Sequence, residues 1–506
     1  MLWLGIYLPF FGLEVARRSA LHGSIRERPT QVAQQPSPQP ADAGDHTTAT
    51  GPEVLVHHQV IVASNPAALA LGIHPGVSLA TAQSLAPDTL RHFPQDRQHE
   101  QARLTFLGEV LYRFSADVSL EAPDAIVLEA GRSLNLFGNI QTLGAQVAET
   151  CRQLGHTTQI RAAATPLAAL ALARTAASTL PQVALDRLGL PEKVVERFAN
   201  MGLITLGQVM ALPHRELAHR FGRDFASYLL RLTGDLPDPR AHIRPRRQFS
   251  QALHLLEPLR DKAALQWPMT RLLEELSQWL ISHQLGAEAI NWSFTAHAAH
   301  TRVNMPVRFA RARQEVRTFL GISELKLTET DLPEDVLSIG LQASRLRPWT
   351  GQTTTLFPDM PGEMPGMGTS SHRGDPVECT ELLDQLGARL GEQACMRLQA
   401  IDCHAPELAW RPLPPQATGS PRQPQLPPIR PGQRPLWVFT PPRLVAITDL
   451  TLLEGPERIQ SQWWEGPVVR DYYVANHHNG ARCWVFVDQT GQTDKMHKWY
   501  LHGYFA

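Results

Sequence analysis

The sequence has little lysine, few cysteines and no long apolar run. Lysine occurs five times among 47 basic residues, so arginine, which suits bidentate contacts with phosphate, carries nearly all the positive charge. Acidic residues number 48 and the formal net charge is −1. This balance excludes a polybasic nucleic-acid coat and an acidic tail, although it leaves room for local basic surfaces. A GC-rich genome produces the same arginine- and alanine-rich composition.

The five cysteines form no CxxC pair, and their odd number argues against a disulfide framework. Cys395, Cys403 and His404 match no common zinc spacing, so we predict neither a metal site nor a cofactor. No apolar stretch reaches the roughly 18 residues of a membrane helix. The apolar start, 1–11, lacks a preceding basic residue and a small-residue cleavage site, which favours a buried strand over a signal peptide. We therefore expect a cytoplasmic protein without a membrane segment.

Three segments of biased composition interrupt the globular pattern. Residues 24–52 are rich in Pro, Gln, Thr and Ala and predict a flexible insertion, because they have too few large apolar side chains to form a core. Residues 358–378 and 404–436 are rich in proline and predict linkers.

The remaining stretches mix strand and helix patterns in an order that predicts an α+β multidomain protein rather than a doubly wound sheet. Residues 190–234 read as purely helical, and the aromatic-rich residues 437–506 predict a small β-rich module whose rings form its core. The expected strands are Leu2–Leu8, Val54–Val62, Ala125–Glu129 and Ala289–His297, and the expected helices are Pro66–Leu85, 97–114, Thr165–Leu180 and Asp261–His283.

A helical hairpin is predicted within Phe198–Leu212, with its turn between Gly202 and Gly207. A second helix that starts after Thr205 would present backbone N–H groups at the positive end of its dipole, which suits phosphate. The same pattern also fits an ordinary hairpin. Downstream arginines, among them Arg246 and Arg247, would extend a DNA-binding surface, or they would form a solvated face.

Several motifs together resemble Y-family (translesion) DNA polymerases, and the tail narrows the resemblance to ImuB-like proteins. They are, in chain order, LWLGIYLPFFGLEV, VASNPAALALGIHPGVSLATAQSLAP, FSADVSLEAPDAIVLEAGRSLNLFG, GLITLGQVMALPHRELAHRFG and the tail LLEGPERIQSQWWEGPVVRDYYV with KWYLHGYFA. The resemblance implies a palm, fingers, thumb and little finger. The domains we expect are palm and fingers in 1–185, thumb in 186–240, little finger in 247–350, a linker in 351–436 and a C-terminal extension in 437–506.

The metal-binding carboxylates of such polymerases are mostly missing. Phosphoryl transfer needs two Mg²⁺ ions held by carboxylates from separate strands. Where the resemblance implies an Asp in the first strand, this chain has Ile6, and Leu8 fills the next inward position. Where it implies an adjacent Asp-Glu pair, this chain has Asp124 followed by Ala125.

The nucleotide contacts are missing as well. The resemblance implies a Tyr and an Arg in the fingers where this chain has Pro66 and Leu69, and palm lysines near Pro166 and Leu170. The sequence therefore predicts a polymerase scaffold without its chemistry.

The hexapeptide Gln352–Phe357 resembles the peptide that bacterial proteins insert into the sliding clamp. In such peptides the glutamine makes polar contacts, and the side chains at the positions of Leu356 and Phe357 fill an apolar pocket. Leucine is more usual where Thr353 or Thr355 stands, and similar hexamers occur by chance.

The resemblance implies a non-catalytic adaptor in DNA-damage-induced mutagenesis. Such an adaptor would hold primer-template DNA, bind the sliding clamp and recruit an ImuA-like protein and an error-prone DnaE-type polymerase. One alternative is an active translesion polymerase with atypical ligands, Asp124, Glu121 and Glu129, although odd offsets along a strand place side chains on opposite faces. A third reading, a clamp-associated protein without DNA contact, conflicts with the thumb-like hairpin.

Overall fold

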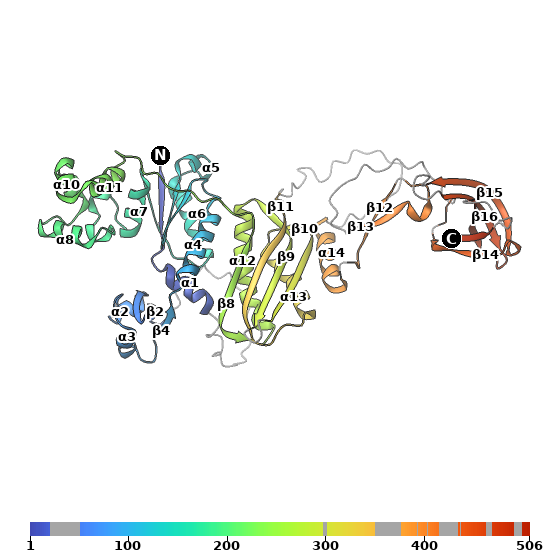
Figure 1. The fold of residues 1–506 in the computed structure, drawn as a ribbon, viewed down its shortest axis with the longest axis horizontal. Coiled ribbons are helices and arrows are strands. Elements are labelled where there is room, and N and C mark those ends of the chain that lie inside the picture. Colours follow the sequence, from blue (N-terminus) through green and yellow to red (C-terminus); the bar gives the residue numbers. More distant parts are fainter. Residues whose placement is uncertain are drawn as a thin grey trace, which may run out of the picture. The chain divides into compact units, whose positions relative to one another are not determined.

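The computed structural model describes residues 1–20, 51–296, 301–349, 376–391, 393–401, 403–413, 434–435, 437–461, 468–489 and 498–505. The chain divides into two compact units, Met1–Ser371 and His372–Ala506. Figure 1 labels many of the elements of each unit. None of the described helices has the length and apolar character needed to cross a bilayer.

The palm-like part of the first unit is built on a four-stranded sheet. Its strand order is β5-β6-β1-β7, and every neighbouring pair is antiparallel. This arrangement confirms the predicted α+β class, because a doubly wound fold would have parallel neighbours. The strands are β1 (Trp3–Tyr7), β5 (Val118–Glu121), β6 (Ala125–Glu129) and β7 (Gln159–Ala163).

Helix α7 (Pro166–Thr175) covers one face of this sheet. It packs so closely that a Cβ on Gly5 would lie 2.4 Å from the carbonyl carbon of Ala169. The predicted helix Thr165–Leu180 is therefore too long: Ala176 has a left-handed φ of 54°, which ends the helix.

Helices α4 (Arg97–Leu111) and α6 (Ile140–Gln153) also pack against the sheet. Leu120 of β5 lies against Gly108 of α4 and is paired in register with Ile126 of β6. Because cross-strand partners share a face, α4 lies on the face opposite α7. The sheet is thus covered on both faces.

The fingers-like part differs from its predicted elements. The expected strand Val54–Val62 is a hairpin of β2 (Glu53–His57) and β3 (Val60–Ser64), turned by His58 and Gln59 with positive φ. Polar residues in the middle of an apolar run mark such a turn. The expected helix Pro66–Leu85 is likewise two helices, α2 (Pro66–Ala70) and α3 (Leu79–Leu85), because Gly72 and Gly76 adopt positive φ between them. Strand β4 (Arg91–Pro94) completes this sheet, and α1 (Phe11–Ala20) lies against it.

The thumb-like part is helical, as the sequence predicts. Phe198, Leu206 and Phe225 are among the buried side chains of its core, which also includes residues of α7. Its helices are α8 (Glu192–Asn200), α9 (Leu206–Met210), α10 (His214–Phe221) and α11 (Arg223–Thr233).

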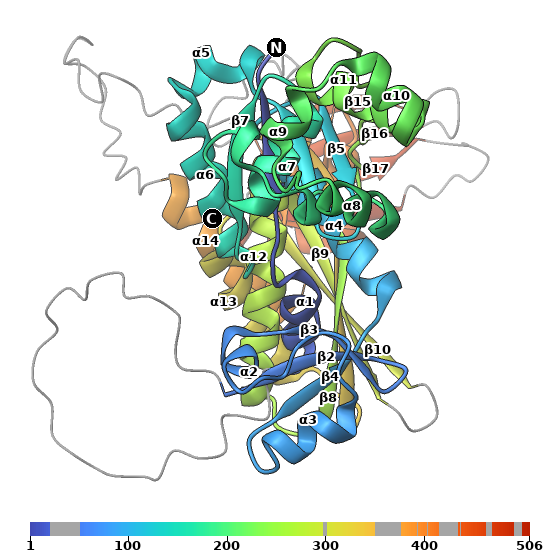
Figure 2. The same cartoon turned by 90° about the vertical axis from the view of Figure 1, so that its left-hand side faces the viewer.

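The little-finger-like part is an antiparallel sheet of order β10-β9-β11-β8 with two helices on one face. Figure 2 shows both helices on the same side of the strands. Trp292 of β9 is fully buried and donates its indole N–H to Ser323 of the second helix at 3.0 Å. The elements are β8 (Ser250–Leu259), α12 (Gln266–Ser282), β9 (Leu285–Ala296), β10 (Arg302–Arg313), α13 (Val316–Glu329) and β11 (Val336–Pro348).

Buried ion pairs join the little-finger-like helix α12 to the palm-like part. Glu275 is fully buried and lies 2.6 Å from Arg18 of α1 and 3.0 Å from Arg103 of α4. Burial alone would raise the pKa of Glu275, but Arg103 and Arg18, with a smaller effect of Arg271, outweigh burial and hold its pKa below the ordinary value. Arg103 also donates to His156, whose pKa burial lowers to about 4. The contact is therefore a charged network around one carboxylate.

The second unit contains a curved five-stranded antiparallel sheet of order β14-β18-β17-β16-β15. Tyr472 and Trp484 are buried and stacked, which confirms the expected β-rich module with an aromatic core. The strands are β14 (Trp437–Val445), β15 (Leu450–Ser461), β16 (Val468–His477), β17 (Arg482–Asp488) and β18 (Trp499–Tyr504).

The interval 351–436, expected to be a linker, is partly structured. It contains α14 (Pro376–Leu390) and a hairpin of β12 (Arg397–Ala400) and β13 (Trp410–Leu413). The leucines of TELLDQLGARL support a helix that the surrounding proline content obscured.

Candidate functional site

The two positions that lack carboxylates lie in the interior of the palm-like sheet. Ile6 of β1 is fully buried and pairs in register with Ile126 and Ile160. Ala125 of β6 is also fully buried and belongs to the apolar cluster around Ala169 of α7. Both positions are therefore packed as core and present no oxygen to a cation.

Asp124, the surviving carboxylate of the motif, is bound to an arginine. Its Oδ1 lies 3.3 Å from a guanidinium nitrogen of Arg174, at the end of α7, and both side chains are about one third exposed. Burial raises the pKa of Asp124, and Arg174 opposes that shift. Nearby Tyr7 has a pKa raised first by burial and then by the Asp124 carboxylate. A cation is thus already present where a metal would otherwise balance this charge.

The other two carboxylates of the active-polymerase alternative have separate partners. Glu121 lies 2.7 Å from Arg240, which also binds Asp238 at 2.6 Å. Glu129 is buried and accepts the backbone N–H groups of residues 131 and 132. Within the described ranges these carboxylates do not gather into a group that could hold one ion. Their separation disfavours the alternative ligand set.

Two of the positions at which the resemblance implies nucleotide contacts, Pro66 and Pro166, start helices. Pro66 is at the first turn of α2, where Asn65 caps the helix by accepting the N–H of Ala68 at 2.9 Å. Pro166 begins α7 in the same way, after the cap Thr165. A proline at the start of a helix fits because its missing N–H would have no helical partner there.

The predicted hairpin is present, but backbone N–H groups of its turn already donate to a side chain of the hairpin itself. Gln208 accepts the N–H groups of Ile204 at 2.7 Å and Thr205 at 3.0 Å. Gly202 adopts a φ of 73°, as a turn glycine does, and Gly207 packs against Pro181, where a Cβ would lie 2.8 Å from another carbon. The two glycines are explained by turn geometry and packing, so a phosphate contact at this turn stays a prediction.

Arg246 and Arg247 lie on the exposed segment between α11 and β8. The Arg246 side chain is 77% exposed, and its Nε is 3.8 Å from Glu109, too far for a strong ion pair. Both guanidinium groups are therefore accessible to a phosphate backbone.

A polar face of the little-finger-like sheet was missed by the sequence reading. Cross-strand partners share a face, so Asn304, Ser293 and Gly340 form one row, and Pro306, Asn291 and Gln342 form the next. These residues are exposed or half-buried, whereas the opposite face packs against α12 and α13. The sequence feature that could have predicted this face is the alternation of polar and apolar residues along β10, where Arg302, Asn304, Pro306 and Arg308 are exposed.

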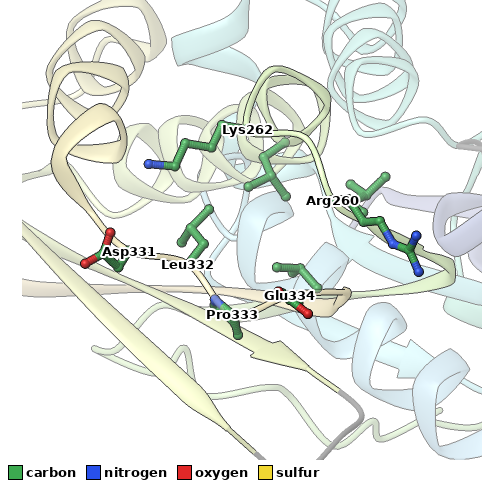
Figure 3. A pocket seen from close by; sticks show the side chains of 9 residues that line it. Arg260, Lys262, Asp331, Leu332, Pro333 and Glu334 are labelled. Atoms are coloured by element: carbon green, nitrogen blue, oxygen red, sulfur yellow. The ribbon is translucent and has the colours of Figure 1, made fainter.

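A hollow of about 260 Å³ lies at one end of the little-finger-like part (Figure 3). Its two basic side chains, Arg260 and Lys262, already have internal partners. Arg260 lies 2.5 Å from Asp335, and Lys262 donates to the carbonyls of Thr328 and Thr330. The hollow is not lined by any of the palm-like residues described above.

The clamp-type residues Gln352, Leu356 and Phe357 lie outside the described residues.

Comparisons with known proteins give one family match and relatives of similar sequence. Residues 6–174 match the impB/mucB/samB family. The chain is 27% identical over 478 residues to Protein ImuB of two strains of Caulobacter vibrioides, NA1000 / CB15N and ATCC 19089 / CIP 103742 / CB 15, covering 86% of this chain and all of those proteins.

Among solved structures, a ternary complex of Dbh is 14% identical with a TM-score of 0.37, and DinB from Sulfolobus solfataricus is 13% identical with a TM-score of 0.36. Each alignment covers 68% of this chain, and 99% and 98% of those two proteins. The matched range includes Ile6, Asp124 and Ala125. The chain is thus similar to Protein ImuB over most of its length, and its residues 6–174 match the impB/mucB/samB family.

Proposed function

We propose that this chain is a non-catalytic adaptor in translesion synthesis. It acts in the cytoplasm, holds primer-template DNA, binds the sliding clamp and brings an ImuA-like protein and an error-prone DnaE-type polymerase to damaged sites. The observation that carries the proposal is the lack of free carboxylates at the positions expected to bind metal. Two ligand positions, Ile6 and Ala125, are buried apolar core, and the third, Asp124, is paired with Arg174.

The physical argument is one of charge. Mg²⁺ binds through carboxylates and waters and dehydrates reluctantly, so a site with one carboxylate competes poorly with bulk water. Here Arg174 also neutralises that single carboxylate and would repel an approaching ion. Divalent metal binding at this centre is therefore doubly disfavoured.

Primer extension with the purified chain tests the absence of catalysis. The chain alone, with Mg²⁺ or Mn²⁺ and all four nucleotides, should leave the primer unextended. Template-dependent extension that disappears in an Asp124→Ala variant would show a working site around the surviving carboxylate.

The proposal that the chain holds DNA rests on two surfaces. One is the polar sheet face of the little-finger-like part, whose small polar side chains and arginines suit a phosphate backbone. The other is the exposed pair Arg246 and Arg247, which follow the thumb-like part in the chain. The predicted contacts Gly202 and Thr205 lie between α8 and α9, and Gly207 lies in α9.

Backbone-directed binding should depend weakly on sequence and fall steeply with salt. Replacing Arg246 and Arg247 by Ala should weaken DNA binding. It should also make the plot of log binding constant against log salt concentration less steep, by about one to two released counterions. A matched control replaces Arg152 and Arg187, which are also exposed but lie elsewhere in the first unit. Equal salt slopes for wild type and the Arg246 and Arg247 variant would remove these residues from the interface.

A further inference from the structure

A cluster of three metal-ligand side chains lies at one end of the C-terminal sheet. One carboxylate oxygen of Asp449 and one ring nitrogen each of His477 and His478 all lie within 4.8 Å of one another. Asp449 immediately precedes β15, His477 ends β16, and His478 begins the turn towards β17. The three donors thus come from two chain segments that meet at the edge of the sheet.

Backbone hydrogen bonds hold these segments together. The N–H of His478 donates to the carbonyl of Asp449 at 2.9 Å, and Leu450 pairs in register with His477. The turn itself is closed by the N–H of His477 to Ala481 at 2.9 Å and by the N–H of Gly480 to His477 at 2.8 Å. The donor atoms are therefore brought together by the folded backbone, which lowers the ordering cost of binding an ion.

We propose that Asp449, His477 and His478 form a binding site for a divalent transition metal, with Zn²⁺ as the expected ion. Two imidazoles with one carboxylate suit Zn²⁺ and its neighbours, whereas Mg²⁺ and Ca²⁺ prefer all-oxygen sites. Three protein donors leave at least one coordination position for water. The site lies outside residues 6–174, and the proposal does not rest on the proposed adaptor function.

The chain has an internal comparison for this site. His57 and His58 are also adjacent histidines at a hairpin turn, with ring centroids 4.2 Å apart, against 4.1 Å for His477 and His478. In the described parts of the chain, the His57 and His58 pair has no third donor within the same reach. The carboxylate of Asp449 is what distinguishes the two pairs, so it should decide whether Zn²⁺ binds.

A bound ion would fasten the start of an otherwise exposed strand. β15 is an edge strand, and Ile459 is its only side chain classed as buried. Edge strands with little buried surface open readily. An ion shared by Asp449 and the two histidines would tie the start of β15 to the β16–β17 turn and slow that opening.

Hydrogen–deuterium exchange on the full chain, with Zn²⁺ as the only added ligand, tests the proposal locally. Zn²⁺ should slow exchange in peptides that cover 447–452 and 475–482, and Mg²⁺ should not. An Asp449→Asn variant, which keeps the shape of the side chain, should lose this protection. Its Zn²⁺ affinity at this site should fall by at least about tenfold, the scale on which even outer-shell partners act.

The control variant replaces His57 and His58 by Asn and should leave the Zn²⁺ effect at 447–452 and 475–482 unchanged. The proposal is overturned if Zn²⁺ slows exchange equally in wild type and in Asp449→Asn. It is also overturned if Zn²⁺ has no effect at these peptides, or if the His57 and His58 variant removes the effect.

Discussion

At the scale of single residues, the state of position 6 decides whether the palm-like part is a dormant active site or a repacked core. The Ile6 side chain is fully buried between neighbouring strands. A carboxylate at that position would lose its hydration without gaining a partner. We expect Ile6→Asp to lower the free energy of unfolding by more than about 2 kcal/mol.

Urea unfolding of the two variants Ile6→Asp and Ile6→Val measures this cost. The Val variant removes one methylene group and should cost only about 1 kcal/mol. An Ile6→Asp protein as stable as wild type would mean that the position is open to water or to an ion, as in an active centre.

The sequence alone shows that positions 6 and 125 are apolar, but it does not show which side chain Asp124 contacts. The apolar residues at 6 and 125 are visible in any reading of the strand motifs. The partner of Asp124 was not visible, because Arg174 is 50 residues away and meets Asp124 only when α7 packs on the sheet. Gly5 permits that packing, and its role too depends on a tertiary contact.

At the scale of elements, segments without an internal turn, such as β6 and α12, were predicted well, and turns were not. β6 has the predicted bounds, and α12 lies within its predicted range. The errors occurred where a short polar or glycine turn interrupts an apolar run, as at His58 and Gln59 within the predicted strand Val54–Val62. Apolar content continues across such a turn, so the hydrophobic pattern alone cannot show it.

The contact of α12 with α1 and α4 gives a prediction at this scale. Replacing Glu275 by Gln would leave Arg18 and Arg103 buried without their countercharge. Removing one partner of a buried ion pair typically costs about 3–5 kcal/mol. We therefore expect Glu275→Gln to destabilise the first unit by this amount.

The matched control is Glu274→Gln, one position earlier on the same helix, where the side chain is 47% exposed. This change should alter stability by no more than about 0.5 kcal/mol. Limited proteolysis gives a second readout, because loss of the contact should increase cleavage in residues 235–249. Similar effects from both variants would show that the buried ion pairs do not hold the little-finger-like part in place.

At the scale of the whole molecule, the proposed clamp contact predicts that clamp binding can be lost without a change in folding stability. Gln352, Leu356 and Phe357 follow the little-finger-like strands in the sequence. Two apolar side chains entering a partner pocket would each contribute roughly 1.5–3 kcal/mol. Changing all three residues to Ala should weaken clamp binding by about 3–5 kcal/mol after ordering costs, with unchanged thermal melting.

The competing account has Leu356 and Phe357 packed onto the little-finger-like part. Clamp affinity and melting temperature, measured on the same triple variant, distinguish the two accounts. A lowered melting temperature with preserved affinity would assign these residues to the core and remove the clamp contact.

Extension of a primer across a template lesion, by a DnaE-type polymerase with the sliding clamp present, tests the adaptor role most directly. We predict no product from this chain alone, and lesion bypass by the added polymerase that increases when the chain is present. That increase should survive Asp124→Ala and disappear in the Gln352, Leu356 and Phe357 triple variant. Bypass by the chain without any added polymerase, abolished by Asp124→Ala, would contradict the account.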